Sequence, residues 1–204
     1  MQRDWRLIDI PFFRIDEASD LYARSFASDR VVAQFVPLDV PDRPAALREF
    51  FKAACITRLA YNQPLMGLEW NNKLVAVAAV TTTYTPKETE SVKRAWSKVT
   101  GIVGDSGVKR LEEYVELRKK NAPPRLHYYL NAIAVDPNYQ SMGFGRALVD
   151  CVMEKAVEDT TAAGVMLDTD GDKNLVFYER CGFSVAGQED LGGVNLLFMY
   201  RAVR

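Results

Sequence analysis

A single stretch restricts the fold of this chain more than any other: residues 133–148, with the sequence IAVDPNYQSMGFGRAL. An apolar run is followed by a polar turn and two glycines, which predicts a strand, a turn and the start of a helix. The first N–H groups of a helix lack partners within it and carry a partial positive charge, and Gly143 and Gly145 would let a ligand approach them. The stretch therefore predicts a loop that can bind a pyrophosphate, with Gln140 and Arg146 as additional contacts.

Strands and helices are predicted on both sides of this loop. Asn71 and Asn72 predict a tight hairpin turn, because Asn tolerates the positive φ that such turns need. Gly182 is expected to end the last helix in the left-handed conformation. The predicted strands are residues 6–10, 65–70, 73–82, 126–135, 165–168, 183–188 and 194–201, and the predicted helices are residues 16–26, the segment between Pro44 and Asn62, and residues 145–159 and 174–180.

Residues 84–124 differ in character from the rest of the chain. The segment opens at Pro86, three glycines interrupt it, and a charged helix is predicted at residues 111–120. It has too few apolar residues for a separate core. We therefore predict one domain, residues 1–204, in which this segment is an insertion.

Composition excludes several classes of protein. The 204 residues are 48% hydrophobic and 26% charged, and the net charge of −1 arises from interspersed acids and bases, so no nucleic-acid partner is predicted. The first residues do not resemble a secretory leader, and the longest apolar run is far shorter than the roughly 20 residues of a membrane span. Three widely spaced cysteines fit a reducing compartment, so we expect a cytoplasmic protein without a membrane partner. One histidine and scattered acids predict no metal site.

A second block, residues 174–183 with the sequence NLVFYERCGF, strengthens the interpretation of the glycine loop. Together, the pattern Gln140-x-x-Gly143-x-Gly145-x-Ala147 and this block resemble the acetyl-CoA signatures of the GNAT N-acetyltransferases. The start His127-Tyr128-Tyr129-Leu130 and the Asn-x-x-x-Tyr-Glu-Arg pattern are similar to the branch containing puromycin N-acetyltransferase, although Asp168-Thr169 stands where that branch often has Glu-Thr. At motif level the resemblance covers residues 126–183, an acetyl-CoA-binding core.

The resemblance implies both a fold and a cofactor site. The fold would be α/β, with a central mixed, mostly antiparallel sheet flanked by helices. The strands at 126–135 and 165–168 would be parallel neighbours, splayed to admit the pantetheine arm of acetyl-CoA. The implied cofactor contacts are Ile133, Ala134, Val135, Gln140, Ser141, Met142, Gly143, Phe144, Gly145, Arg146, Ala147, Asn174, Phe177 and Tyr178.

Acetyl transfer to an amine needs two proton transfers. The departing thiolate takes a proton, and the resemblance assigns that role to Tyr178. The group that accepts the proton of the amine stays open between His127, Asp168 and a water relay, with Glu69 and Asp170 as weaker candidates.

The predicted function is direct transfer of an acetyl group from acetyl-CoA to an amine, interpreted as a small molecule, by a monomer or a homodimer. The insertion and the helices between residues 16 and 60 are expected to select the acceptor, because loops on a rigid scaffold often carry specificity.

The same residues allow other interpretations. A dinucleotide fingerprint would use Gly143, Gly145 and Asp168 but needs a third small residue where Leu148 stands, and a simple tight turn would leave residues 174–183 unexplained. Cys181 as an acyl-carrying nucleophile would need a base and oxyanion donors nearby. A catalytically silent acyl-CoA-binding sensor would keep the cleft and lose turnover.

Overall fold

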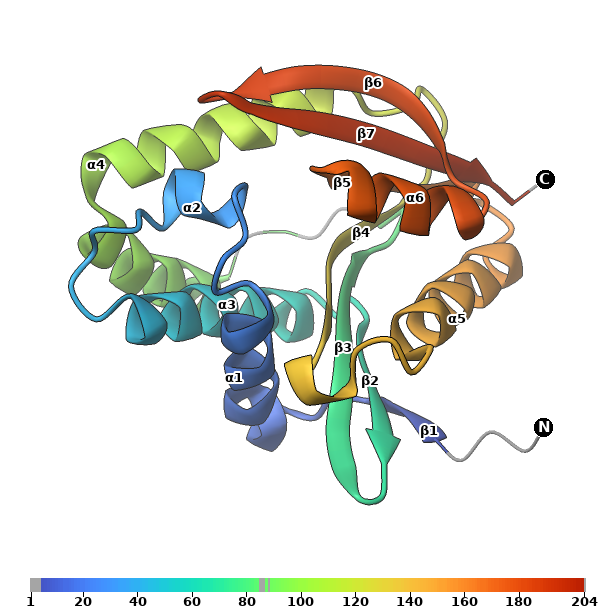
Figure 1. Cartoon of the computed structure of the whole chain (residues 1–204), viewed down its shortest axis with the longest axis horizontal. Coiled ribbons are helices and arrows are strands. Elements are labelled where there is room, and N and C mark those ends of the chain that lie inside the picture. Colours follow the sequence, from blue (N-terminus) through green and yellow to red (C-terminus); the bar gives the residue numbers. More distant parts are fainter. Residues whose placement is uncertain (1–4, 85–86, 88, 204) are drawn as a thin grey trace.

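The computed structural model describes residues 5–84, 87 and 89–203. Seven strands form one sheet in the order β1-β2-β3-β4-β5-β7-β6 (Figure 1). The strands are β1 (Trp5–Asp9), β2 (Leu65–Trp70), β3 (Lys73–Thr81), β4 (Tyr128–Val135), β5 (Gly164–Thr169), β6 (Ser184–Leu191) and β7 (Val194–Ala202). The helices are α1 (Ile15–Ser25), α2 (Val32–Phe35), α3 (Arg43–Ala60), α4 (Glu90–Lys120), α5 (Phe144–Glu158) and α6 (Asp172–Arg180), with single 3-10 turns at Phe12–Arg14 and Pro137–Tyr139. None of the helices described here is long and apolar enough to cross a membrane.

Among the described strands, only β4 and β5 run parallel to each other, which confirms the predicted mixed, mostly antiparallel α/β fold. Their pairing begins with Tyr128 opposite Val165 and ends with Leu130 opposite Leu167. β4 continues to Val135, so the rest of its edge toward β5 has no strand partner. A dinucleotide-binding fold needs a mostly parallel sheet, and this topology excludes it.

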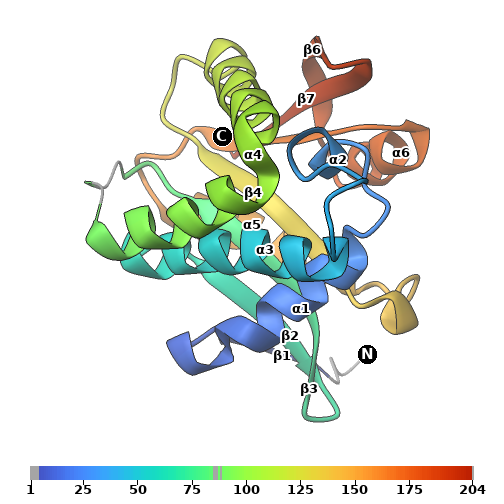
Figure 2. The same ribbon diagram turned by 90° about the vertical axis from the view of Figure 1, so that its left-hand side faces the viewer.

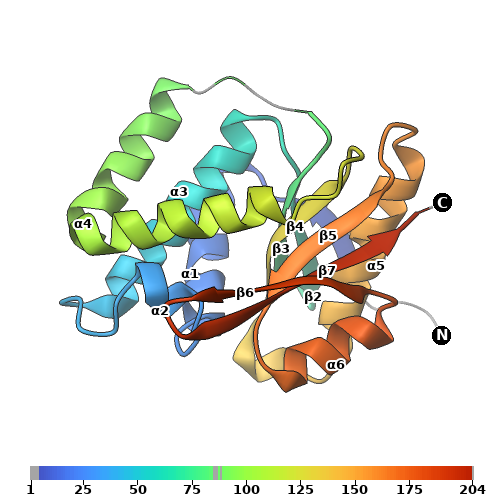
Figure 3. The ribbon, with the colours of Figure 1, turned by 90° about the horizontal axis from the view of Figure 1, so that it is seen from above.

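Different helices cover the two faces of the sheet (Figures 2 and 3). Helices α1 to α4 share a core with one face, and α5 and α6 cover the other. Successive residues of a strand point to opposite faces, so on β3 Val77 and Ala79 join the first core while Ala78 and Val80 join the second. A residue's place in a strand therefore decides which helices it meets.

β4 carries a bulge at Asn131. Ala132 pairs with Ala79 of β3 and Leu130 with Val80, which leaves Asn131 as the extra residue. The bulge reverses the alternation of the strand: Tyr129 faces the core of α1 to α4 before it, and Ala132 does so after it. Bulges commonly re-aim a side chain beside a functional site.

The prediction for residues 84–124 was right in part. The expected helix 111–120 lies in the second arm of α4, and Gly104, with φ 66°, interrupts α4 at a kink. The prediction was wrong about the extent of the helix, because α4 begins at Glu90, and about Gly101 and Gly107, which keep helical geometry. Val99, Val103 and Tyr114 of α4 lie in the same core as α1 and α3. The segment thus buries its few apolar residues against the main core rather than in one of its own. Pro86 and residues 85 and 88 of the segment lie outside the described residues.

Helix α2 was not predicted. The carboxylate of Asp29 accepts a hydrogen bond from the Val32 N–H at 2.8 Å and so satisfies a free donor at the start of this short helix. A Cβ at Gly107 would come within 2.7 Å of the Phe35 carbonyl oxygen, so glycine allows α4 to approach α2 closely.

Candidate active site

The loop between β4 and α5 has the backbone expected of an anion-binding turn. Gly143 precedes α5 with φ 88°, a conformation that favours glycine, and a Cβ there would meet no atom within 4 Å. A Cβ at Gly145 would lie 3.4 Å from the Phe177 ring. The amide of Ala147 donates to the Gly143 carbonyl at 3.0 Å, so the free amide donors end at Arg146, one residue earlier than predicted.

Helix α1 holds this loop in place. Arg24 forms an ion pair with Asp136 at 2.7 Å, and the Ser25 hydroxyl donates to the Val135 carbonyl at 2.8 Å. Burial opposes ionisation of Asp136, but the bonds from the Asn138 N–H and from Arg24 lower its pKa. These contacts anchor the start of the loop, at residues 135 and 136, to α1.

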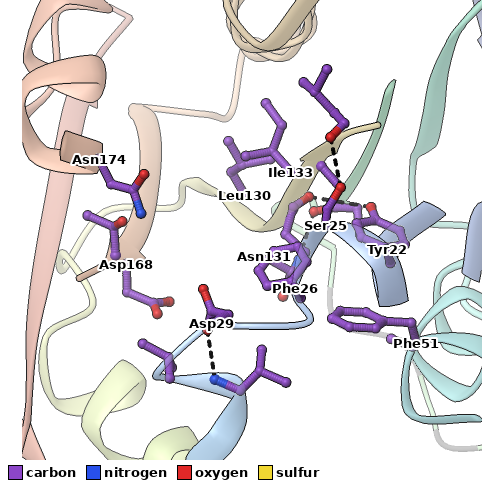
Figure 4. Close-up of a pocket in the computed structure, with 18 of the residues that line it drawn as sticks. Tyr22, Ser25, Phe26, Asp29, Phe51, Leu130, Asn131, Ile133, Asp168 and Asn174 are labelled. Atoms are coloured by element: carbon purple, nitrogen blue, oxygen red, sulfur yellow. Dashed lines mark hydrogen bonds between the residues drawn. The ribbon is translucent and has the colours of Figure 1, made fainter. Parts of the chain in front are cut away.

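A cavity of about 880 Å³ extends from the glycine loop to the side of the sheet covered by α1 to α4. Figure 4 shows part of its lining. Tyr178 comes from the α5/α6 side and Asp168 from the α3/α4 side, so the cavity passes through the opening between β4 and β5. Its size is in the range of small-molecule sites. The cofactor and catalytic residues predicted from the sequence that line it are Ile133, Ala134, Val135, Gln140, Ser141, Gly143, Phe144, Gly145, Arg146, Asp168, Asn174, Phe177 and Tyr178.

Tyr178 lines this cavity from α6. Its ring contacts Phe177 and Phe183 edge-on, with centroids 5.0 and 6.0 Å away, and the side chain is buried. Burial, and then the charges of Asp168 and other anions nearby, raise the pKa of Tyr178. Its hydroxyl therefore keeps its proton at neutral pH, which a proton donor requires.

Asp168, at the end of β5, faces the cavity from the other side. The hydroxyl of Tyr114 donates to its two oxygens at 2.9 and 3.0 Å, and the hydroxyl of Tyr129 also donates to it. Burial raises the pKa of Asp168, while the Arg118 charge and the two tyrosines act in the opposite direction.

Asp29 is a second carboxylate at the cavity, in the segment between α1 and α2. Figure 4 shows Asp29 and Asp168 extending toward the same space. Burial raises the pKa of Asp29 to about 6, and the charges of Asp170 and Asp168 add to this. Two carboxylates around one space favour a cationic ligand group such as an ammonium.

A polar chain crosses the floor of the cavity from Asp168 toward α3. Arg118 stacks over the Tyr129 ring at 3.7 Å and donates to the Asn131 side chain at 2.9 Å. Asn131 in turn donates to the Thr81 hydroxyl at 2.8 Å, and Arg58 donates to the same hydroxyl.

Aromatic side chains line the same part of the cavity and form its aromatic wall. Tyr22 stacks on Phe51 with centroids 5.0 Å apart, and Phe35 stacks on Phe50 at 5.1 Å. Trp96 contacts Phe50 edge-on at 5.5 Å. We call the part of the cavity on the α1 to α4 side of the sheet the acceptor half. It combines an aromatic wall with charged groups of both signs.

Several predicted residues do not meet at the cavity. His127 precedes β4, at the end of the strand away from the glycine loop and roughly 25 Å from it by strand rise. Its Nδ1 lies 2.9 Å from the Arg125 carbonyl oxygen, and it is not among the cavity-lining residues. Met142 is 53% exposed and also does not line the cavity. Glu69, which lies on β2, forms an ion pair with Arg14 and does not line the cavity.

Cys181 does not suit covalent chemistry. It is buried, burial raises the pKa of its thiol, and it does not line the cavity. A thiolate nucleophile needs the opposite shift.

Sequence reasoning did not single out four of the polar cavity residues described above: Asp29, Arg58, Tyr114 and Asn131. Arg118 was expected only as one charge of the helix in the insertion. Asp29, Arg58 and Tyr114 belong to segments interpreted as a loop, a helix and an insertion, where single polar residues carry no pattern. Asn131 left one signal, because it is the polar residue within the apolar strand sequence YYLNAIAV.

Comparison with known proteins identifies the class of this fold and site. The model of the acetyltransferase (GNAT) family matches residues 28–183, so the chain belongs to the GNAT family. This family uses acetyl-CoA for acetyl transfer.

Solved structures share the fold along nearly the whole chain. A histone acetyltransferase HPA2-related acetyltransferase from Corynebacterium glutamicum has TM-score 0.72 and 18% identity, with 97% of this chain aligned to 96% of that one. An N-acetyltransferase from Staphylococcus aureus has TM-score 0.63 and 14% identity, covering 96% and 100%. The putative acetyltransferase yncA from Salmonella typhimurium, solved with its cofactor acetyl-CoA, has TM-score 0.58 and 12% identity, covering 99% and 95%. At these identities the likeness concerns the fold alone.

Proposed function

We propose that this chain is an N-acetyltransferase that moves acetyl from acetyl-CoA directly to the amine of a small molecule. One observation carries the proposal: a single cavity joins the glycine loop, the unpaired edge of β4 and the side chain of Tyr178. An acyl-CoA needs a pyrophosphate site, a slot for its arm and a proton donor at its sulfur. The cavity offers all three in that order.

The residues present fit acetyl-CoA. The amides of residues 144–146 and the open space above Gly143 suit the pyrophosphate, and Gln140 and Arg146 lie beside them. The edge of β4 that faces β5 has no strand partner beyond Leu130, and its backbone suits the amides of the pantetheine arm. Asn174 and Phe177 of α6 complete the wall. Acetyl-CoA supplies the activated acetyl group as a thioester.

The side chains of the cavity divide the proton transfers between them. The amine nitrogen forms a bond to the acetyl carbon, the carbon–sulfur bond breaks, and Tyr178 gives its proton to the sulfur. An amine of pKa about 10.4 is almost fully protonated at pH 7, so its nitrogen loses two protons on the way to the amide, one before it attacks and one after. Asp29 and Asp168 hold the ammonium group and accept these protons, directly or through water; one proton restores Tyr178 and the other passes to solvent. His127 has no part in this scheme.

The domain organisation, location and oligomeric state are also proposals, which rest on the sequence. We propose a single domain, a cytoplasmic location and a monomer or homodimer. The aromatic, partly enclosed acceptor half supports a small molecule over a peptide. The narrower likeness to puromycin N-acetyltransferase stays a prediction.

The deciding experiment measures thiol release from acetyl-CoA over a library of amines, together with calorimetric binding of acetyl-CoA. Transfer to at least one amine, with an acetylated product seen by mass spectrometry, is expected. Tight binding of acetyl-CoA without transfer to any amine would instead establish a silent acyl-CoA-binding module.

A further inference from the structure

Arg58 is a charged residue of the cavity for which the acetyl-transfer scheme has no use. It lies in the last turn of α3, and its guanidinium reaches the cavity beside β3. Its hydrogen bonds go to the Thr81 hydroxyl and, at 3.4 Å, to the Val80 carbonyl, both of which are neutral. Among the described residues, no carboxylate lies within ion-pairing distance of it.

The surroundings of Arg58 make this cation costly. Burial lowers the pKa of its guanidinium to about 10, and the nearby positive charge of Arg118 lowers it as well. The group still carries its charge at neutral pH. A position in the last turn of a helix favours a cation, but this effect is weak compared with the cost of partial burial among apolar groups. Packing alone would be served as well by an uncharged side chain.

The polar chain separates the two charged ends of the acceptor half. From Arg58 it runs through Thr81 and Asn131 to Arg118, and then to Asp168. The carboxylates that suit an amine lie at one end, and Arg58 lies at the other. The aromatic wall of Tyr22, Phe51 and their neighbours lines the same half of the cavity, and Tyr22 interacts electrostatically with Arg58.

We propose that the acceptor amine carries a carboxylate on the far side of an aromatic or apolar body, and that Arg58 binds this carboxylate. The inference rests on the proposed acetyl transfer and names its substrate class. A guanidinium presents paired N–H donors that match a carboxylate, and in a partly desolvated cavity such a pair is strong. The body of the acceptor would lie against the aromatic wall, with its amine between Asp29 and Asp168.

The test uses 4-(aminomethyl)benzoate and its methyl ester, which share the amine and the ring and differ in the charge. Initial rates of acetyl transfer with the full chain give kcat/KM for each. We expect the parent to prefer the acid by at least tenfold. Arg58→Met should bring the ratio of acid to ester close to one, and Arg58→Lys should restore part of it. Arg48→Met, at an exposed arginine of α3 paired with Asp20, is the matched control and should keep the parent ratio.

The outcomes separate this inference from the proposed function. Transfer to the ester as fast as to the acid, or an acid preference that survives in Arg58→Met, would overturn the substrate class and leave acetyl transfer standing. Acetyl-CoA binding without transfer to either compound or to the wider amine library would overturn the proposed function, and the substrate class with it.

Discussion

Tyr178 differs from phenylalanine by one hydroxyl, so a substitution by phenylalanine removes the proposed proton donor without changing the shape of the core. We expect Tyr178→Phe to lower kcat by about 10- to 10⁴-fold, because the thiolate would leave without a proton donor. Acetyl-CoA affinity, measured by calorimetry, should change little because the ring contacts with Phe177 and Phe183 remain. Equal turnover in the variant would reduce Tyr178 to a packing residue.

Asp29 should reveal its raised pKa in the stability of the protein. An acid whose folded pKa is about 6 instead of 3.8 destabilises the folded state when ionised: the cost is absent below pH 3.8, grows between the two values and is complete above pH 6. Asp29→Asn keeps an acceptor for the Val32 N–H and removes the charge. In urea unfolding we expect the variant to be more stable by about 1 kcal/mol at pH 7.5, which is less than the full pKa shift implies because the cavity is open to solvent. This gain in stability should shrink at pH 4.5.

The same substitution should act oppositely on catalysis. If Asp29 helps to take up the amine proton, kcat/KM of the parent rises as pH passes through about 6, and Asp29→Asn loses both rate and that rise. A variant with the parent pH profile would leave Asp168 as the acceptor of the proton. Gain in stability with loss of activity is the expected signature of a functional carboxylate.

At the scale of elements, the turn before α5 depends on one backbone conformation. Gly143 has φ 88°, so Gly143→Ala strains the turn even though the space around it is open. We expect acetyl-CoA to bind at least tenfold more weakly by calorimetry, because the loop amides would move. Gly101→Ala is the control: this glycine lies within α4, a Cβ there would meet nothing, and alanine should preserve binding. Unaltered binding in Gly143→Ala would refute the pyrophosphate site.

How far the sequence predicts each element depends on how local its causes are. The β4–loop–α5 unit was predicted because its strand, turn and glycines follow one another in the chain. α4 was misjudged because its place is set by distant partners: Trp96 donates to the Thr57 hydroxyl of α3 at 2.9 Å, and Lys120 pairs with Glu189 of β6 at 2.8 Å. Tertiary contacts of this kind leave no local pattern.

The catalytic candidates follow the same division. Tyr178 was found because it belongs to a contiguous block with a family pattern. Asp168 was found as an acid at a strand end, but its tyrosine partners could not be, since Tyr114 comes from α4, 54 residues away along the chain. Asn131 is aimed by a bulge that appears only once β3 and β4 are paired.

At the scale of the whole molecule, the two halves of the chain have different tasks in the cavity. Residues from β4 to α6 form the part that suits acetyl-CoA, whereas α1 to α4 and the segments between them form most of the acceptor half, to which β4 and β5 add Asn131 and Asp168. Removing residues 87–122 would not test their role cleanly, because Val99, Val103 and Tyr114 would leave the main core. Acceptor choice has to be tested by substitutions that keep α4 folded.

Leu111 and Val115 offer that test, because they line the cavity from α4 near its surface. Leu111→Ala with Val115→Ala enlarges the acceptor half at a cost of about 1–3 kcal/mol in stability. We expect kcat/KM to shift toward bulkier amines across a graded series, with acetyl-CoA affinity unchanged because neither side chain is near the glycine loop. Ile102→Ala, on a part of α4 that does not line the cavity, should keep the parent ranking. An identical ranking in the double variant would show that α4 supports the fold without selecting the substrate, and selection would then rest with α1 and α3.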